Sequence, residues 1–317
     1  MRKALPIIML LFPSILNAQK VFKIAVIEEK THYPIPYTAI ALIKQNLAVN
    51  TDEDGLFDLD EEVIKSGDTL LVTSQGFLPE KLPVRFFEEN RVVEMKADTL
   101  KNTLFLVAGN KNQNLWLNND FNPQKLGAFA GPAKVEDSFD YLQLAQKFEL
   151  PEANAMLKRV KVARLIQYID PQSSVVLPNS RVAPERTKFL LRIYDVDSLT
   201  GMPGKDLCDS LIEIKNNERK IIRINVTNLK IKIPGKAFFV GVQLLRLPFN
   251  VCYVELPSSP KSSFTSSYSC FKPSIAISDV KHDKLNTYVL NFRNEWHPYT
   301  YFAPDYTDFA ISAQVEY

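Results

Sequence analysis

Apolar and polar side chains alternate in short runs along residues 20–97, as in "VFKIAVIEE", "YTAIALIK", "DTLLVTS" and "RVVEMKA". A period of two residues is typical of β-strands that rest one face on a core, and no helical period competes in this part of the chain. Turns containing Gly, Pro or Asp separate the runs at intervals of roughly 8–12 residues. The pattern predicts a β-sandwich over residues 20–97.

The alternation weakens over residues 98–134 and returns in the rest of the chain. "GNKNQNLWLNNDFNPQ" is rich in Asn and Gln and predicts a connecting segment, with Trp116 and Phe121 expected to pack against a domain. "DYLQLAQKFEL" fits a strand or a helix, and a strand is favoured. Runs such as "KFLLRIYDVD", "KAFFVGVQLL" and "DFAISAQVEY" predict a second, larger and jelly-roll-like β-sandwich over 135–317, so the whole chain is expected to be all-β.

The N-terminus has the layout of a secretory signal peptide. Arg2 and Lys3 precede a short apolar run, and a small residue, Ala18, stands before Gln19. The run is shorter than the roughly 20 residues that span a bilayer, and no later segment has that length. We expect residues 1–18 to be removed and the protein to be exported to the periplasm, the outer-membrane periphery or the medium.

Charge and cysteine content narrow the classes of partner. The formal net charge of +2 gives no reason to expect nucleic acid as a partner. Export permits disulfides, and Cys252 and Cys270 lie in neighbouring predicted strands, which suits either a bridge between them or two unbridged thiols. Cys208 is then expected to be a buried small apolar residue.

The stretch "NTDEDGLFDLDE" has the spacing of an EF-hand calcium loop, from Asn50 at position 1 to Glu61 at position 12. An EF-hand needs a helix on each side, whereas both flanks of this stretch alternate like strands. A β-turn is therefore favoured, in which Asp52 accepts hydrogen bonds from backbone amides and Gly55 takes a positive φ.

The same hairpin carries a resemblance to a known family. "YPIPYTAIALIK", "NTDEDGLFDL" and "LLVTSQGF" resemble the carboxypeptidase regulatory-like family, a transthyretin-like sandwich of exported Bacteroidetes proteins. The matching positions are Pro36 with Ala39 and Ile40; Thr51, Asp52, Gly55 and Phe57; and Ser74, Gly76 and Phe77. The glycine common in the family's first strand is absent. The resemblance implies a fold and an envelope location. It does not imply peptidase activity, because the module is an accessory to the enzymes after which it is named.

No catalytic motif emerges from the sequence. A zinc carboxypeptidase needs H-x-x-E and a distant third histidine, but the sequence after His32, His282 and His297 reads "YPI", "DKL" and "PYT". A G-x-S-x-G elbow and phosphate-binding glycine loops are also missing from the sequence. We expect no enzymatic activity and no cofactor.

Two segments are candidate binding sites. "YDVDSLTGMPGKD" gathers Asp195, Asp197 and Asp206, which suit either calcium or the turns of a strand connection. "NEWHPYTYFAPDYTDF" contains Trp296, Tyr299 and Tyr301, whose rings suit either a sugar or protein ligand or the packing of the last strands. The sequence favours turns for the first and core packing for the second.

Two functions from different classes remain. The first is a non-enzymatic envelope protein with a structural or binding role, whose N-terminal module serves as a spacer or docking platform for an envelope protein or glycan. The second is carbohydrate or peptide binding by the C-terminal sandwich.

Overall fold

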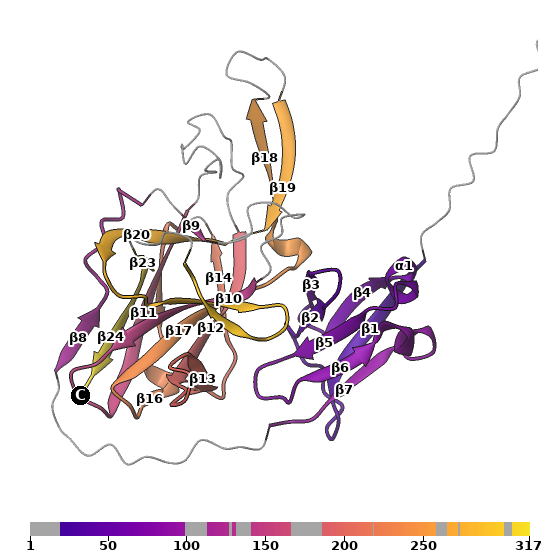
Figure 1. Ribbon diagram of the computed structural model, residues 1–317, viewed down its shortest axis with the longest axis horizontal. Coiled ribbons are helices and arrows are strands. Elements are labelled where there is room, and N and C mark those ends of the chain that lie inside the picture. The colour runs from indigo at the N-terminus through magenta and orange to yellow at the C-terminus, as the bar shows by residue number, and fades with distance from the viewer. Residues whose placement is uncertain are drawn as a thin grey trace, which may run out of the picture.

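Strands dominate both halves of the computed structural model, which forms two β-sandwiches (Figure 1). The structure describes residues 20–98, 113–126, 129–130, 141–165, 186–217, 219–257, 265–271, 273–300 and 306–317. The predicted signal peptide, residues 1–18, lies outside them. Within the described part of the chain, every helix falls short of the length and apolar character needed to cross a bilayer.

The N-terminal sandwich consists of two sheets. One has the order β4(Leu56–Asp60), β1(Val21–Glu28), β7(Val92–Met95), with β1 antiparallel to β4 and parallel to β7. The other is antiparallel in the order β3(Leu47–Asn50), β2(Ala39–Leu42), β5(Thr69–Thr73), β6(Glu80–Pro83). A short helix α1(Glu61–Lys65) and a 3₁₀ turn η1(Val84–Glu88) complete it. The helix interrupts a stretch where strand-like alternation was expected.

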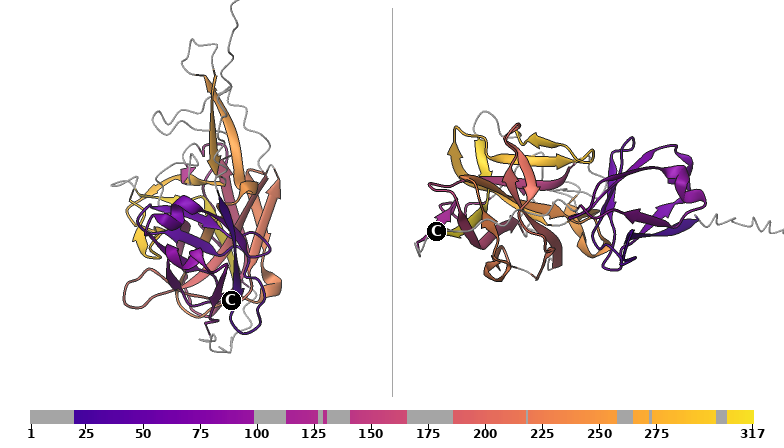
Figure 2. Two further views of the ribbon diagram at one scale, coloured as in Figure 1. Left: turned by 90° about the vertical axis from the view of Figure 1, so that its right-hand side faces the viewer. Right: turned by 90° about the horizontal axis from the view of Figure 1, so that it is seen from below.

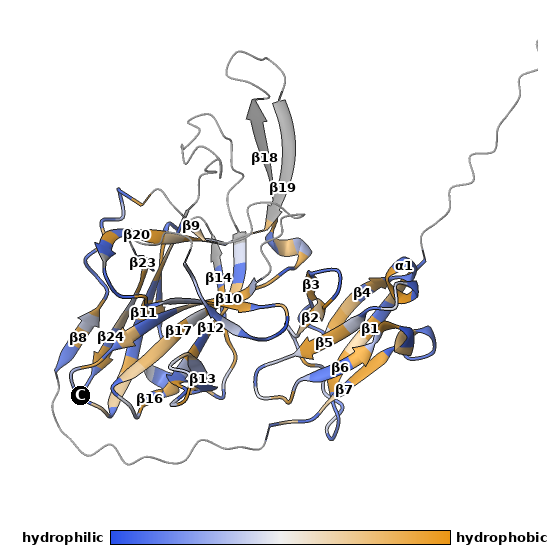
Figure 3. Ribbon diagram, viewed as in Figure 1, coloured by the Kyte–Doolittle hydropathy of each residue, from blue (hydrophilic) through white to orange (hydrophobic). Residues whose placement is uncertain are grey.

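The core of this sandwich lies between the two sheets. In β4 the pattern Phe57 buried, Asp58 exposed, Leu59 buried follows the two-residue period that the sequence predicts. Phe57 and Leu59 pack with Ile24 of β1 and with Ile40 and Leu70 of the other sheet. The hydropathy colouring shows the apolar residues concentrated along these strands and polar residues in the turns (Figure 3).

The C-terminal sandwich also consists of two main sheets. The first has the order β13(Pro203–Asp206), β12(Arg186–Val196), β17(Ala237–Leu244), β10(Tyr141–Glu149), β21(Thr287–Asn291), β22(Trp296–Pro298), with β14(Ile212–Asn217) also paired to β12. The second has the order β23(Tyr306–Phe309), β20(Ser274–His282), β11(Ala155–Leu165), β24(Ile311–Glu316), β8(Asn114–Leu117); β15(Ile221–Asn225) and β16(Lys232–Ile233) pair with β11, and β9(Phe129–Ala130) pairs with β20. The turns η2(Thr227–Leu229) and η3(Pro248–Asn250) connect strands.

Alternate residues of the two main sheets meet in one core. Phe189 of β12 and Phe238 of β17 face Val160 of β11 and Ile311 of β24, all of them fully buried. The opposite face of β12 carries Lys188, Leu190, Arg192 and Tyr194, and these residues matter for the site described below.

The predicted connecting segment 98–134 is in part a piece of the C-terminal sandwich. β8 pairs with β24, and β9 pairs with β20. Phe121 is buried beside Ala163, as the sequence led us to expect of this ring. The ambiguous "DYLQLAQKFEL" forms strand β10, as favoured.

The stretch 50–61 is a hairpin turn. The Asp52 carboxylate accepts hydrogen bonds from the amides of Asp54 (3.0 Å) and Leu56 (2.8 Å), and Gly55 has a φ of +71°. Strand β4 follows at once and carries Asp58 and Asp60 away from the core face. Among these described residues, strand β3 precedes the stretch, strand β4 runs inside it and only the single-turn helix α1 follows, so the two flanking helices of an EF-hand are not formed.

The two sandwiches pack against each other (Figure 2). Ile40, Leu70 and Val72 face the N-terminal core, whereas Ala39, Ala41 and Leu71 point the other way. The second group contacts Leu142, Leu290 and Phe292 of the C-terminal sandwich. Strands β2 and β5 are therefore buried on both faces, which explains the unbroken apolar runs "AIAL" and "LLV".

Candidate functional site

A buried lysine joins the two sandwiches. Lys188 of β12 is 3% exposed, and its ammonium pairs with Glu53 from the N-terminal hairpin and with Glu213 at 3.4 Å. It also donates to the Tyr37 hydroxyl at 3.1 Å, which in turn donates to Glu213 at 2.8 Å. Nearby, the backbone amide of Arg246 donates to the side chain of Asn50 at 2.8 Å. These bonds hold the N-terminal hairpin in one position on β12.

Alkaline pH is expected to weaken this contact. Burial raises the pKa of Tyr37 to about 12, above the ordinary value near 10. Because the folded pKa is the higher one, the contribution of Tyr37 to stability is complete below about pH 10 and is lost as the pH rises to about 12. We expect the stability difference between the wild type and Tyr37→Phe to fall by about 2 kcal/mol over that range, measured by urea denaturation. A difference that stays constant would contradict the assignment.

A cleft of about 430 Å³ lies between the two sandwiches, next to the apolar contact. The C-terminal sandwich forms one wall of the cleft with the outward faces of four strands. The residues on this wall are Gln143 of β10, Arg192 and Tyr194 of β12, Gln243 of β17 and Leu290 of β21. Residues of the N-terminal sandwich that also line this interdomain cleft are Ala39, Thr73, Ser74, Gly76, Phe77, Pro79 and Asp98. Both sandwiches are needed to form it.

Hydrogen bonds hold the polar side chains of the cleft. Arg192 pairs with Asp206 of β13, with Nε 3.1 Å from Oδ1, and its Nη1 donates to Gln243 Oε1 at 2.8 Å. The Tyr194 hydroxyl donates to Gln143 Oε1 at 2.6 Å. Burial by itself lowers the pKa of Arg192, but Tyr194 and Asp206 raise it by more, so the guanidinium stays charged.

The glycine at position 241 leaves space for the side chains of Arg192 and Tyr194. Gly241 of β17 lies opposite Arg192 in the strand register. A methyl group at this position would lie 3.0 Å from the Tyr194 ring and 3.2 Å from the Arg192 side chain. The absence of a side chain at 241 therefore leaves space for the Arg192 and Tyr194 side chains.

The three predicted calcium ligands do not form one site. Asp197 Oδ1 accepts bonds from the amides of Leu199 and Thr200 and so shapes the turn, and those from Thr200 lower the pKa of Asp197. Asp195 accepts from the Lys205 amide, and Asp206 is paired with Arg192. In the part of the chain that the structure describes, no group of three or more His, Cys, Asp or Glu side chains could hold a metal ion.

The predicted aromatic residues separate. Trp296 is partly buried, packs edge-to-face on Tyr194 with ring centroids 5.6 Å apart, and lines the interdomain cleft. Tyr299 packs on Phe309 at 5.4 Å, against the C-terminal core. Tyr301 lies outside the described residues. The structure therefore brings Trp296 and Asp206 to one cleft and directs Tyr299 elsewhere.

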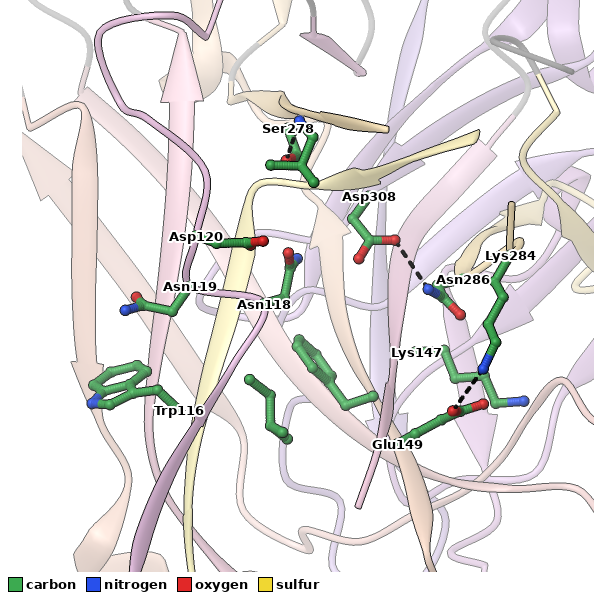
Figure 4. Close-up of a pocket in the computed structure, with 13 residues that line it drawn as sticks. Trp116, Asn118, Asn119, Asp120, Lys147, Glu149, Ser278, Lys284, Asn286 and Asp308 are labelled. Carbon is green, nitrogen blue, oxygen red and sulfur yellow. Dashed lines mark hydrogen bonds and ion pairs between the residues drawn. The ribbon is translucent and has the colours of Figure 1, made fainter. Parts of the chain in front are cut away.

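A second hollow, the side groove of about 530 Å³, lies on the flank of the C-terminal sandwich (Figure 4). Several of the polar side chains along it bond to one another or to backbone. Asn286 donates to Asp308 at 3.3 Å, Lys284 pairs with Glu149 at 3.3 Å, and Asn118 donates to the carbonyls of Phe309 and Ile311. Because these polar groups of the side groove are already paired, the interdomain cleft is the stronger candidate for a binding site.

Cys252 and Cys270 are opposite each other in the backbone register of the hairpin β18(Val251–Pro257) and β19(Thr265–Phe271), which projects from the C-terminal sandwich (Figure 1). The disulfide between them stays a prediction. Peptide mapping under non-reducing conditions should recover the two cysteines in one cross-linked pair, with the buried Cys208 as the one thiol alkylated after denaturation. Three alkylated thiols in the exported protein would contradict it.

The sequence analysis missed Gln143, Lys188, Arg192 and Gln243. Each stands at an outward position of its strand, and all but Lys188, which follows Thr187, lie between two apolar residues, as in "LLRIYDVD" and "VGVQLL". Such positions are usually solvated, so only their burial in the folded protein sets them apart.

No family model matches the chain, and no curated protein matches it. Two solved structures that match are the cysteine protease and lectin-like domains of Cwp84, a surface layer associated protein of Clostridium difficile, at 13% identity and a TM-score of 0.33, and the clostridial cysteine protease Cwp84 after propeptide cleavage, at 14% and 0.36. The matches cover 56% and 80% of this chain but 32% and 52% of those chains. The chain thus spans about a third and about half of their length. Similarity at this level supports no conclusion about fold or function.

Proposed function

We propose that the protein is an exported, non-enzymatic component of a Bacteroidetes-type cell envelope with a structural or binding role, in which the N-terminal sandwich is a docking platform. Export rests on the signal peptide expected over residues 1–18. The partner is an envelope protein or a glycan. The absence of a catalytic motif in the sequence supports a role without chemistry.

The observation that supports a platform rather than a loose spacer is the contact between the sandwiches. Lys188 joins Glu53 of one sandwich to Glu213 of the other, and the outward side chains of β2 and β5 are covered. A loose spacer joins two domains that move independently, which is the usual expectation for small and polar contacts between domains. Here an apolar contact and a buried charge hold the domains together.

Site-specific photo-crosslinking in cells of the source organism tests the proposal. A photoreactive residue at Tyr33, exposed by 72% on the N-terminal sandwich, is compared with one at Leu199, exposed by 92% on the C-terminal sandwich. We expect the chain to reach the envelope without residues 1–18 and to crosslink to one component from position 33 more strongly than from position 199. Retention in the cytoplasm would contradict export. Equal crosslinking from both positions would contradict the platform, and turnover of a peptide or glycan library would contradict a role without chemistry.

A second function, binding of a carbohydrate or peptide ligand, is favoured by one specific observation. The cleft gathers Trp296 and Asp206, one from each segment for which a ligand was considered. Its volume of about 430 Å³ lies within the range of about 300–1,000 Å³ typical of small-molecule sites.

A further inference from the structure

Two glutamines with open amide groups line the interdomain cleft. Gln143 and Gln243 are opposite each other in the register of β10 and β17, and they are 6% and 4% exposed. Gln243 Oε1 accepts from Arg192, and since a guanidinium can only donate, this bond fixes which end of the amide is oxygen. The Tyr194 hydroxyl donates to Gln143 Oε1 at 2.6 Å, which leaves the amide nitrogen as the other end of the Gln143 side chain.

The amide nitrogens are the unpaired ends. Among the described residues, Nε2 of Gln143 and Nε2 of Gln243 have no hydrogen-bond acceptor, and neither is one of the fully enclosed polar atoms without a partner. Both NH₂ groups are therefore open to the cleft. Buried donors cost free energy unless they are paired, so water or a ligand oxygen must meet them.

The apolar side of the cleft is fixed in place. Trp296 is held edge-to-face by Tyr194 and packs near Leu142 and Leu290. An indole face offers flat apolar surface with a polar tip, which suits the C–H face of a sugar ring. Amide donors lie on the same wall as this aromatic ring.

The charges of the cleft disfavour an anionic ligand. Three carboxylates line it, those of Asp98, Asp206 and Asp209, against two cations, Lys205 and Arg192, of which Arg192 is already paired with Asp206. Sugar hydroxyls both donate and accept, so a neutral sugar can satisfy the amide donors and the carboxylate acceptors together.

The wall of the cleft also disfavours an extended peptide. Such a peptide binds best along a free strand edge, where its backbone continues the sheet. Strands β10, β12 and β17 are interior strands, each with neighbours on both sides. The cleft therefore presents side chains and leaves no backbone edge of these three strands to pair with.

We propose that the interdomain cleft binds a neutral saccharide, with Trp296 against a sugar ring and the Nε2 groups of Gln143 and Gln243 donating to its oxygens. This inference rests on the second function proposed above and names its ligand class. It does not depend on the docking role.

The chain contains two tryptophans, which makes the test direct. The variant Trp116→Phe leaves Trp296 as the single indole, and it is titrated with maltose, cellobiose, lactose and chitobiose while its fluorescence is followed. We expect a saturable change in emission with at least one disaccharide. The further substitution Gln143→Glu keeps an oxygen acceptor for the Tyr194 hydroxyl but removes the two N–H donors of the Gln143 amide. We expect it to weaken binding of the disaccharide about tenfold.

The matched control is Trp296→Phe, which leaves Trp116 in the side groove as the reporter. We expect this variant to show no saturable change in emission with the same sugars. A response from Trp116 alone, or unchanged affinity in the folded Gln143→Glu variant, would overturn the proposal. If a pool of neutral tripeptides saturates the Trp296 signal and no disaccharide does, the ligand class is wrong while the cleft remains a binding site. If neither the disaccharides nor the tripeptides change the Trp296 emission, both the saccharide proposal and the second function are wrong.

Discussion

Replacing Gly55 with alanine is expected to lower the free energy of unfolding by about 3 kcal/mol. Gly55 has a φ of +71°, a conformation that costs an L-residue about 1–2 kcal/mol. A methyl group there would also lie 2.8 Å from the Val26 carbonyl oxygen and 3.0 Å from the Ile35 amide nitrogen. Both are backbone atoms that hydrogen-bond to each other at 2.9 Å, so neither can move away cheaply. Urea denaturation followed by far-UV circular dichroism measures the loss.

Gly76→Ala is the matched control for this substitution. Gly76 has a φ of +78°, but a methyl group there meets no atom within 4 Å. Only the backbone cost remains, so we expect a loss of about 1 kcal/mol. Equal losses for the two variants would show that the close approach at Gly55 is not what the hairpin requires.

Replacing Glu53 and Glu213 together by glutamine is expected to destabilise the protein by about 2–3 kcal/mol. The double variant leaves the ammonium of Lys188, on a side chain only 3% exposed, without a countercharge, and this is the costly way to break a buried pair. Removing one partner of a buried ion pair usually costs about 3–5 kcal/mol. The loss expected here is at or below the lower end of that range, because the Glu53 side chain is 62% exposed and water can reach the rim of the site.

Lys188→Met is the contrasting variant. Methionine fills a similar space and removes the charge that needs a partner, while Glu53 can turn to water. We expect a loss below about 1 kcal/mol, measured by the same denaturation experiment. A larger loss for Lys188→Met than for the double glutamate variant would mean that the lysine contributes net attraction rather than a charge that must be satisfied.

The sandwich character of both halves could be predicted because it follows from local patterns. In β4, Phe57 and Leu59 face inward and Asp58 outward, as the two-residue period requires. The turn before β4 was also predictable, since Asp52 and Gly55 are residue types that satisfy and permit that backbone. The α1 helix was not predicted, because a single turn of helix leaves too short a pattern to recognise.

The candidate site was predictable only in fragments. Trp296 and Asp206 were singled out for ligands of different kinds, and Tyr299 was grouped with Trp296 although it packs on Phe309. Gln143 and Gln243 gave no signal, because a polar residue at an outward strand position is ordinarily solvated. They line the cleft together with residues of the other sandwich, and no local pattern reports that neighbour.

The sequence by itself determined where the strands run, which of their side chains alternate towards a core, and where the chain turns, because these follow from interactions among near neighbours. The tertiary structure decided which outward faces are covered. Tyr37 meets Lys188 across 151 positions of the chain, and Arg192 meets Gln243 across 51. The first contact depends on how two folded surfaces fit together, and the second on which strands of one sheet become neighbours. Packing and pairing of this kind turn ordinary polar positions into the wall of a cleft.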